Sequence, residues 1–140
     1  MTDVKSIAYH ESGHTIIALT QGCVVRTVAI TPRCGERRLG ETRITFSKDK
    51  LRAAMQATMV PLGGTIAQLK AFPDSSRGED VDLQIAYDSA AYLSSNPRHF
   101  IELMQLRTRK LIDLHWRSVE AVAAALLKHG KLTGEEIDAL

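Results

Sequence analysis

The chain has 140 residues, of which 44% are hydrophobic and 24% are charged, a composition typical of a folded globular domain. Its formal net charge of +2 is too small to indicate binding to nucleic acid or to an anionic membrane surface. The longest apolar run, Ala121–Leu127, has seven residues, so no membrane-spanning segment is expected, and the N-terminus lacks the apolar core of a signal peptide. We therefore expect one cytoplasmic domain over residues 1–140.

The first part of the chain predicts one helix followed by a hairpin. Apolar residues with helical spacing predict a helix over Asp3–Thr20, and Gly22 stands where a C-terminal cap is expected. Two segments rich in β-branched residues, Cys23–Ile30 and Glu41–Phe46, then predict two strands of a hairpin. Because a two-stranded ribbon is marginal alone, we expect it to pack on helices or to pair with a third strand.

The middle of the chain predicts two further helices. The pattern over Ser47–Phe72 is helical, and Pro61 predicts a kink or a break within it. Pro73–Gly78 has the composition of a loop. A helix is expected to begin at residue 79 or 80 and to run to about Leu93.

The last part of the chain is also mostly helical. Asn96 followed by a proline is typical of a helix start, and the helical pattern continues to His129 as one helix or two. Gly130 is expected to end it. Thr133 and Glu136 have the spacing of a capping box, which predicts a last short helix.

The strongest chemical signal is the pattern H-E-x-x-H at residues 10–14, on the first predicted helix. Since histidines four positions apart lie on one face of a helix, His10 and His14 can bind one zinc ion together. Glu11 then projects beside the metal, where it can take a proton from an attacking water and pass it to a leaving amine. Gly13 favours this interpretation over an ordinary amphipathic helix. A glycine inside a helix costs about 1 kcal/mol relative to alanine, and it is better explained if another backbone passes close by.

A catalytic zinc site needs three protein ligands, and the motif supplies two. The candidates for the third are Asp74, Glu79, Asp80, Asp82, His99, Glu102 and His115. Spacing alone does not choose among them. We expect an acidic ligand from the cluster at 79–82, although these residues could equally serve as the N-terminus of a helix, where negative charge is favoured. A cysteine ligand is not expected, because the two cysteines do not form a CxxC pair.

Several segments outside the motif carry a resemblance to a known family. In chain order they are Ala8–His14, Val28–Arg33, Leu39–Thr42, Leu62–Gly64, Gly78–Leu83, Glu120–Ala123, Leu126–Leu127 and Leu132–Ile137. Together these segments resemble the peptidase domain of the FtsH family of ATP-dependent zinc metalloproteases. The resemblance touches both ends of the chain, and its ordered blocks are more specific than the five-residue motif.

The resemblance implies a mainly α fold of the α+β kind, a helical zinc-peptidase domain with a small β-hairpin or sheet packed on the HExxH helix. It implies that His10, His14 and Asp82 bind Zn²⁺ and that Glu11 is the general base. The resemblance, and not the spacing, selects Asp82. The implied reaction is endopeptidase cleavage of unfolded or partly unfolded protein. An extended substrate is expected to pair with the exposed edge of one of the two strands.

The chain also departs from that family. The family's ATPase and transmembrane parts have no counterpart in these residues, so we expect a stand-alone domain that cleaves peptides and flexible segments or works with a separate ATPase unfoldase. A homo-oligomer is compatible with the resemblance. Gln68 stands where the family has a carboxylate, so no metal-binding role is expected for it.

Two other interpretations remain open from the sequence. One is a catalytically inactive, zinc-stabilised protein-interaction module derived from an FtsH-like peptidase, and the other is a chain whose motif binds no metal. Glu11 favours the enzyme, because a structural site has no use for a general base and normally has four protein ligands.

Overall fold

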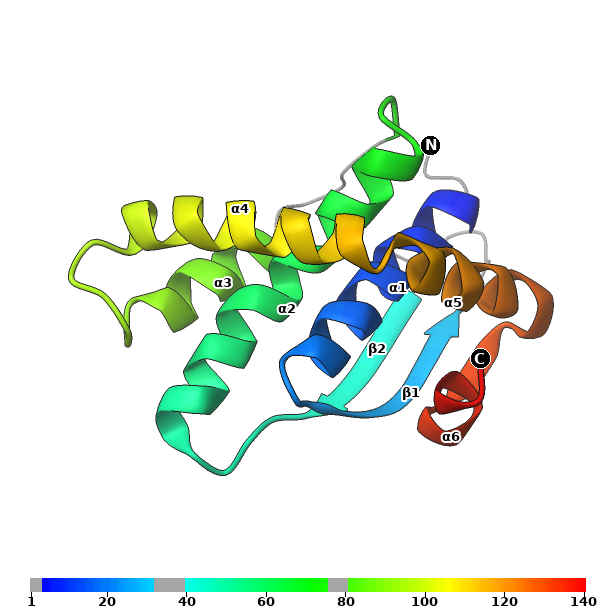
Figure 1. Cartoon of the computed structure of the whole chain (residues 1–140), viewed down its shortest axis with the longest axis horizontal. Coiled ribbons are helices and arrows are strands. Elements are labelled where there is room, and N and C mark those ends of the chain that lie inside the picture. Colours follow the sequence, from blue (N-terminus) through cyan, green and yellow to red (C-terminus); the bar gives the residue numbers. More distant parts are fainter. Residues whose placement is uncertain (1–3, 32–39, 76–80) are drawn as a thin grey trace.

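The computed structural model describes residues 4–31, 40–75 and 81–140 of the chain. The elements in chain order are α1 (Val4–Thr20), β1 (Val24–Ile30), β2 (Gly40–Thr45), α2 (Lys50–Ala71), α3 (Val81–Ala90), α4 (Pro97–Leu114), α5 (Trp116–His129), β3 (Lys131–Thr133) and α6 (Gly134–Asp138) (Figure 1). The expected mainly α fold of the α+β kind is confirmed. None of these helices combines the length and the apolar character needed to cross a membrane.

The strands form an antiparallel sheet in the order β2-β1-β3. The expected hairpin is present: β1 pairs with β2 from Val24 opposite Thr45 to Ile30 opposite Gly40, with an irregularity at Arg26. Its predicted polar tip, residues 35–38, lies outside the described residues. The third strand, β3, comes from the C-terminal part of the chain and covers the other edge of β1 over residues 27–29. β2 therefore forms an edge of the sheet, whereas the middle of β1 does not.

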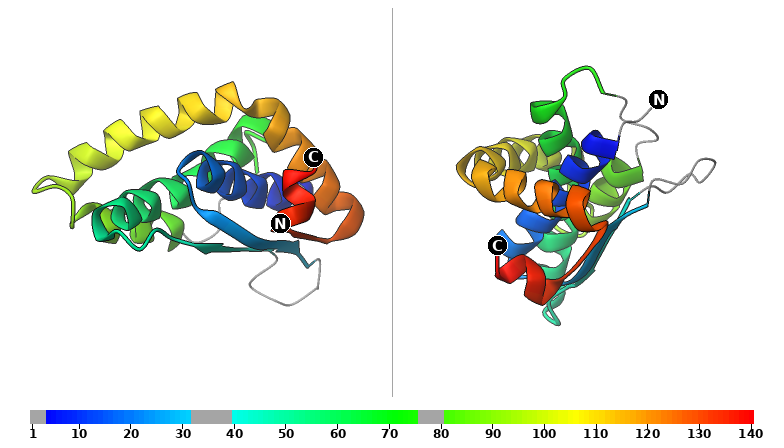
Figure 2. Two further views of the ribbon diagram at one scale, coloured as in Figure 1. Left: turned by 60° about the horizontal axis from the view of Figure 1, so that its bottom comes forward. Right: turned by 90° about the vertical axis from the view of Figure 1, so that its right-hand side faces the viewer.

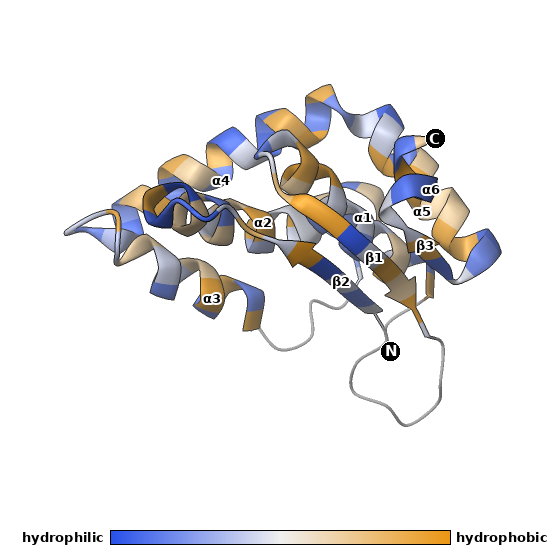
Figure 3. Cartoon of the chain, turned by 90° about the horizontal axis from the view of Figure 1, so that it is seen from below, coloured by the Kyte–Doolittle hydropathy of each residue, from blue (hydrophilic) through white to orange (hydrophobic). Residues whose placement is uncertain are grey.

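The sheet is covered by helices on one face. α1 packs against β1 and β2 along that face, as two further views show (Figure 2). Among the described elements, no helix covers the opposite face of β1 and β2 (Figure 3). Arg43 and Thr45 of β2 are exposed. The hydrophobic core contains buried residues of every helix named above and of strands β1 and β3. From β2, the partly buried Ile44 packs against this core. The HExxH helix is thus held between the sheet and the other helices.

Glycines allow α1 and α2 to cross very closely. A Cβ on Gly13 would overlap the carbonyl group of Gly63, and a Cβ on Gly63 would lie 2.6 Å from Cγ1 of Ile17. The close backbone approach that Gly13 indicated is therefore present, and its partner is α2. This crossing sets the two helices that surround the candidate site at a short, fixed separation.

Two helices, α2 and α3, differ from the sequence-based expectations in their limits. α2 begins at Lys50, because the Asp49 side chain accepts a hydrogen bond from the backbone N–H of Leu51 and caps the helix there. It continues without a break through Pro61, which is buried, because packing on α1 keeps the helix continuous across the missing hydrogen bond. α3 ends at Ala90 instead of Leu93.

The long C-terminal helical pattern is two helices. α4 ends at Leu114 and α5 begins at Trp116, with His115 between them in a non-helical conformation. Gly130 ends α5 in the left-handed conformation, with a φ of 76°. The capping box of Thr133 and Glu136 is formed, so the predicted start of the last helix is confirmed.

Candidate metal centre

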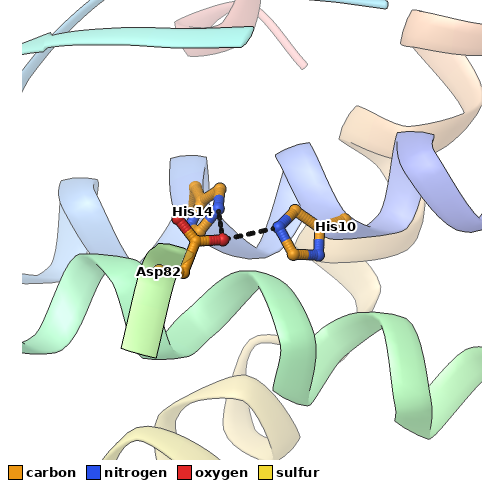
Figure 4. A group of neighbouring side chains, drawn as sticks. All are labelled: His10, His14 and Asp82. Carbon is orange, nitrogen blue, oxygen red and sulfur yellow. Dashed lines mark hydrogen bonds and ion pairs between the residues drawn. The ribbon is translucent and has the colours of Figure 1, made fainter. Parts of the chain in front are cut away.

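Three predicted ligands meet where α1 faces the first turn of α3. His10 and His14 lie one turn apart on α1, and their Nε2 atoms are 2.9 Å and 3.2 Å from Oδ2 of Asp82. Figure 4 shows both rings turned toward this carboxylate, which α3 supplies. The potential ligand atoms all lie within 4.8 Å of one another. The fold therefore brings two imidazoles and one carboxylate to one point.

The other nitrogen of each ring is held by an oxygen from α2. Nδ1 of His14 lies 2.8 Å from the carbonyl oxygen of Val60, and Nδ1 of His10 lies 2.8 Å from Oε1 of Gln68. Because a carbonyl oxygen only accepts, Nδ1 of His14 donates to it. In a neutral ring this leaves the Nε2 lone pair free for a metal ion. Such outer hydrogen bonds are the usual way in which proteins orient histidine ligands.

Gly64 of α2 leaves room beside the two rings. A Cβ on Gly64 would lie 2.6 Å from Nε2 of His14 and 2.7 Å from Nε2 of His10. Any other residue at this position would place its Cβ atom against the atoms that face the metal position. A metal ion can bind beside these rings only if residue 64 has no side chain.

These residues fit a zinc ion. The donor set is two imidazole nitrogens and one carboxylate oxygen, a combination that zinc takes in catalytic sites with three protein ligands. Gly64 keeps the space beside the imidazole nitrogens clear. His10, His14 and Asp82 would hold the ion.

Glu11 lies next to these ligands and is almost completely buried, with 6% of its surface exposed. The hydroxyl group of Thr42 on β2 lies 3.5 Å from Oε2 of Glu11 and 3.4 Å from its backbone carbonyl oxygen. Burial raises the pKa of the Glu11 carboxyl group, and the nearby histidines oppose this increase. A carboxylate with a raised pKa is suited to accepting a proton in the neutral range.

The charges at the site favour a proton on His14 and a deprotonated carboxylate on Asp82. Burial alone would lower the pKa of His14, but the hydrogen bond with Asp82 and the charges of Glu11 and Asp82 outweigh it and raise this pKa to about 9. Burial acts to raise the pKa of Asp82, yet hydrogen bonds from His10 and His14 hold it well below its usual range. A divalent cation at this position takes the place of the histidine proton.

The other candidates for the third ligand that the structure describes do not belong to this group. Asp74, His99 and Glu102 are exposed, and His115 separates α4 from α5. Glu79 and Asp80 lie outside the described residues. Within the described ranges, the group of potential ligands that converges is His10, His14 and Asp82.

Sequence reasoning missed the part that Gln68 plays beside His10. The sequence predicts only that Gln68 is not a metal ligand, because an amide stands in place of the family's carboxylate. The structure instead places its side chain against the far nitrogen of His10. A signal was present in the sequence, because Gln68 follows Gly64 by four positions and so lies on the same face of the helix.

An H-E-x-x-H helix whose two imidazoles meet a carboxylate from a second helix defines a site of the metallopeptidase class. The family model of peptidase family M41 matches residues 1–95, and the chain belongs to this family. This match confirms the family resemblance found in the sequence. It includes all four candidate site residues, whereas α4, α5, β3 and α6 follow the matched range.

Curated relatives of this chain carry the name ATP-dependent zinc metalloprotease FtsH. The relative from Ralstonia pickettii (strain 12J) is 39% identical over 92 residues, which cover 61% of this chain and 13% of the relative. The relative from Burkholderia pseudomallei (strain 1710b) is 36% identical over 94 residues, which cover 63% of this chain and 14% of the relative. A relative from Pirellula staleyi is 39% identical over 93 residues, which cover 60% of this chain and 13% of the relative. The alignments thus span only about one eighth of the length of these relatives.

Proposed function

We propose that the chain is a zinc-dependent endopeptidase that cleaves peptide bonds in unfolded or flexible protein segments. The observation that carries the proposal is the convergence of His10, His14 and Asp82 next to the buried carboxylate of Glu11. Membership in peptidase family M41 and the names of the relatives support it. A structural zinc site would need a fourth protein ligand, and the described residues bring only three together.

Each residue has a separate task in this proposal. His10, His14 and Asp82 hold the metal, and Gly64 keeps the space beside them clear. When bound, zinc lowers the pKa of water to about 7 and polarises the carbonyl group of the peptide. Glu11 takes the proton of the attacking water and delivers it to the nitrogen of the leaving amine as the peptide bond breaks.

The substrate is proposed to bind as an extended strand along β2. Of the two strands that the sequence offered for this role, β1 is covered by β3 over residues 27–29, so β2 is favoured. Thr42 of β2 contacts Glu11, and a Cβ on Gly40 would lie 2.7 Å from Cγ of Glu11. A peptide added to this strand would therefore pass close to the general base. Only a segment that can become extended can bind in this way, which is why unfolded or flexible chains are the proposed substrates.

The decisive experiment compares Glu11→Gln with the wild-type protein. Denatured casein and a peptide library serve as substrates. Stably folded proteins serve as controls that should resist cleavage. Glu11→Gln is expected to keep about one zinc per chain while its cleavage rate falls by at least about 100-fold, because it cannot accept the proton. Glu102→Gln is the matched control, since the Glu102 side chain is 60% exposed and should affect neither zinc content nor cleavage.

Two results would contradict the proposal. If Glu11→Gln cleaves as fast as the wild type, Glu11 is not the general base. If the wild-type protein binds zinc but cleaves nothing across a broad library, the zinc-stabilised interaction module becomes the better explanation. A separate ATPase partner would be indicated if folded substrates are cleaved only when an ATP-driven unfoldase is added.

A further inference from the structure

A short series of hydrogen bonds connects His10 to the end of α2. Nδ1 of His10 lies 2.8 Å from Oε1 of Gln68, and the Nε2 amide group of Gln68 donates to Oγ of Ser75 at 2.9 Å. The hydroxyl group of Ser75 in turn donates to the backbone carbonyl oxygen of Phe72 at 2.7 Å. The series therefore begins at a backbone group and ends at a candidate metal ligand.

The direction of these bonds is determined by the Ser75 hydroxyl group. It has one hydrogen, which it donates to Phe72, so its oxygen accepts from Gln68. This places the NH₂ group of Gln68 toward Ser75 and its oxygen toward His10. Because an amide oxygen only accepts, Nδ1 of His10 must carry the hydrogen, and in a neutral ring Nε2 then presents its lone pair to the metal position.

The two histidines are oriented by different means. His14 donates to the Val60 carbonyl oxygen, which belongs to the helix backbone and does not depend on a side chain. His10 depends on Gln68, whose surface is only 3% exposed, so water cannot easily replace the amide. The amide is neutral, and it therefore orients His10 through hydrogen-bond direction and not through charge.

We propose that Gln68 and Ser75 are positioning residues that hold His10 in the Nδ1–H form and thereby set the zinc affinity of the site. This inference rests on the proposed metal site, but it does not require the protein to be an active peptidase. It predicts that an acceptor at position 68 matters for zinc binding more than the volume of the side chain there.

The test measures the zinc dissociation constant by competition with a chromophoric chelator. Gln68→Met keeps the length of the side chain but removes the acceptor, and it is expected to weaken zinc binding by roughly 10- to 100-fold, as is usual for such partners of metal-binding histidines. Gln68→Glu keeps an acceptor toward His10 and should stay within about threefold of the wild type or bind more tightly. Ser75→Ala removes the group that orients the amide and should have a smaller effect in the same direction.

Gln56 provides a matched control on the same helix. It is a buried glutamine that accepts from the backbone N–H of Ser47 and donates to the carbonyl oxygen of Gln21, and neither of these partners belongs to the candidate site. Gln56→Met should therefore lower the melting temperature about as much as Gln68→Met does, while leaving zinc affinity unchanged. The visible spectrum of the cobalt-substituted protein gives a second readout, which should change in Gln68→Met but not in Gln56→Met.

The inference is overturned if Gln68→Met loses stability but binds zinc as tightly as the wild type, since Gln68 would then be only structural. It is also overturned if Gln68→Glu and Gln68→Met weaken binding equally, because the acceptor would then not matter. Should Gln68→Met fail to fold, the comparison of Gln68→Glu and Ser75→Ala with the wild type decides instead. Tight zinc binding without any peptide cleavage would contradict the proposed function and leave this inference standing, whereas a wild-type protein that binds no zinc would overturn both.

Discussion

Gly64 and His14 lie so close together that a Cβ on the glycine would be 2.6 Å from both Cε1 and Nε2 of the histidine ring. The same added atom would be 2.7 Å from Nε2 of His10. The glycine on α2 therefore limits what can stand between the imidazoles of α1. The close packing of α2 on α1 therefore directly affects the space that is available beside the two candidate metal ligands.

Replacing Gly64 by alanine should damage the site directly. The added methyl group can be accommodated only if the imidazoles move, and forced overpacking of this kind costs typically about 1–3 kcal/mol. We expect zinc binding to weaken by roughly 10- to 100-fold, measured by chelator competition. Gly134→Ala is the control, because its Cβ would meet the backbone of Val25 on β1 and not the rings. Equal zinc affinities of the two variants would argue against a site beside Gly64.

Asp82 should be the third zinc ligand. Asp82→Asn removes the charge that faces both histidines, so the purified variant should lose most of the single zinc ion expected per chain, as measured by atomic emission. His14→Ala should behave in the same way. Asp88→Asn, on the exposed side of the same helix, should retain full zinc. Full zinc in both Asp82→Asn and His14→Ala would refute the assigned ligands.

Zinc should stabilise the folded protein. A ligand that binds only the folded state at 100 times its dissociation constant adds about 2.7 kcal/mol to the free energy of unfolding. The melting temperature is therefore expected to fall when a chelator removes the metal and to recover when zinc is returned. In Asp82→Asn, added zinc should raise the melting temperature little or not at all. A rise as large as in the wild type would mean that zinc binds elsewhere.

Strand pairing along β2 can be tested with modified substrates. An extended peptide that adds to this edge must use its own backbone N–H groups for hydrogen bonds. Peptides with N-methyl groups at alternate positions flanking the cleaved bond should lose kcat/KM, and those methylated at the intervening positions should lose much less. The series is built on the best peptide found in the library. Equal kcat/KM values for both sets would show that the substrate does not bind as an added strand.

Helix α5, which follows the residues that match the family model, is hydrogen-bonded to α1. The hydroxyl group of Ser12 donates to the carbonyl oxygen of Val119 on α5 at 2.6 Å, and Ser12 is fully buried. Ser12→Ala should lower the free energy of unfolding by about 0.5–1.5 kcal/mol, the usual net value of such a bond, in chemical denaturation. Ser89→Ala, whose hydroxyl group makes an exposed bond within α3, should change it by less than about 0.5 kcal/mol. Equal effects would mean that this connection between α1 and α5 adds no stability.

The features that depend on neighbouring residues could be predicted from the sequence. The spacing of His10 and His14 places them one turn apart on a helix, and this follows from helical geometry alone. The strands, the cap at Asn96 and the capping box of Thr133 depend on similarly local preferences. Gly13 also indicated a close backbone contact, although its partner on α2 was not identified.

The features that join distant parts of the chain were decided only by the tertiary structure. Asp82 is 72 positions from His10, and its selection among the acidic residues needed the family resemblance, because spacing carries no information over that distance. The contact of Gln68 with His10, across 58 positions, could not be predicted for the same reason. The pairing of β3 with β1, which leaves β2 as the edge for a substrate, likewise depends on a contact between the two ends of the chain. A residue's immediate neighbours determine whether it is helical or extended, but only the packing of α1, α2 and α3 determines which side chains surround His10.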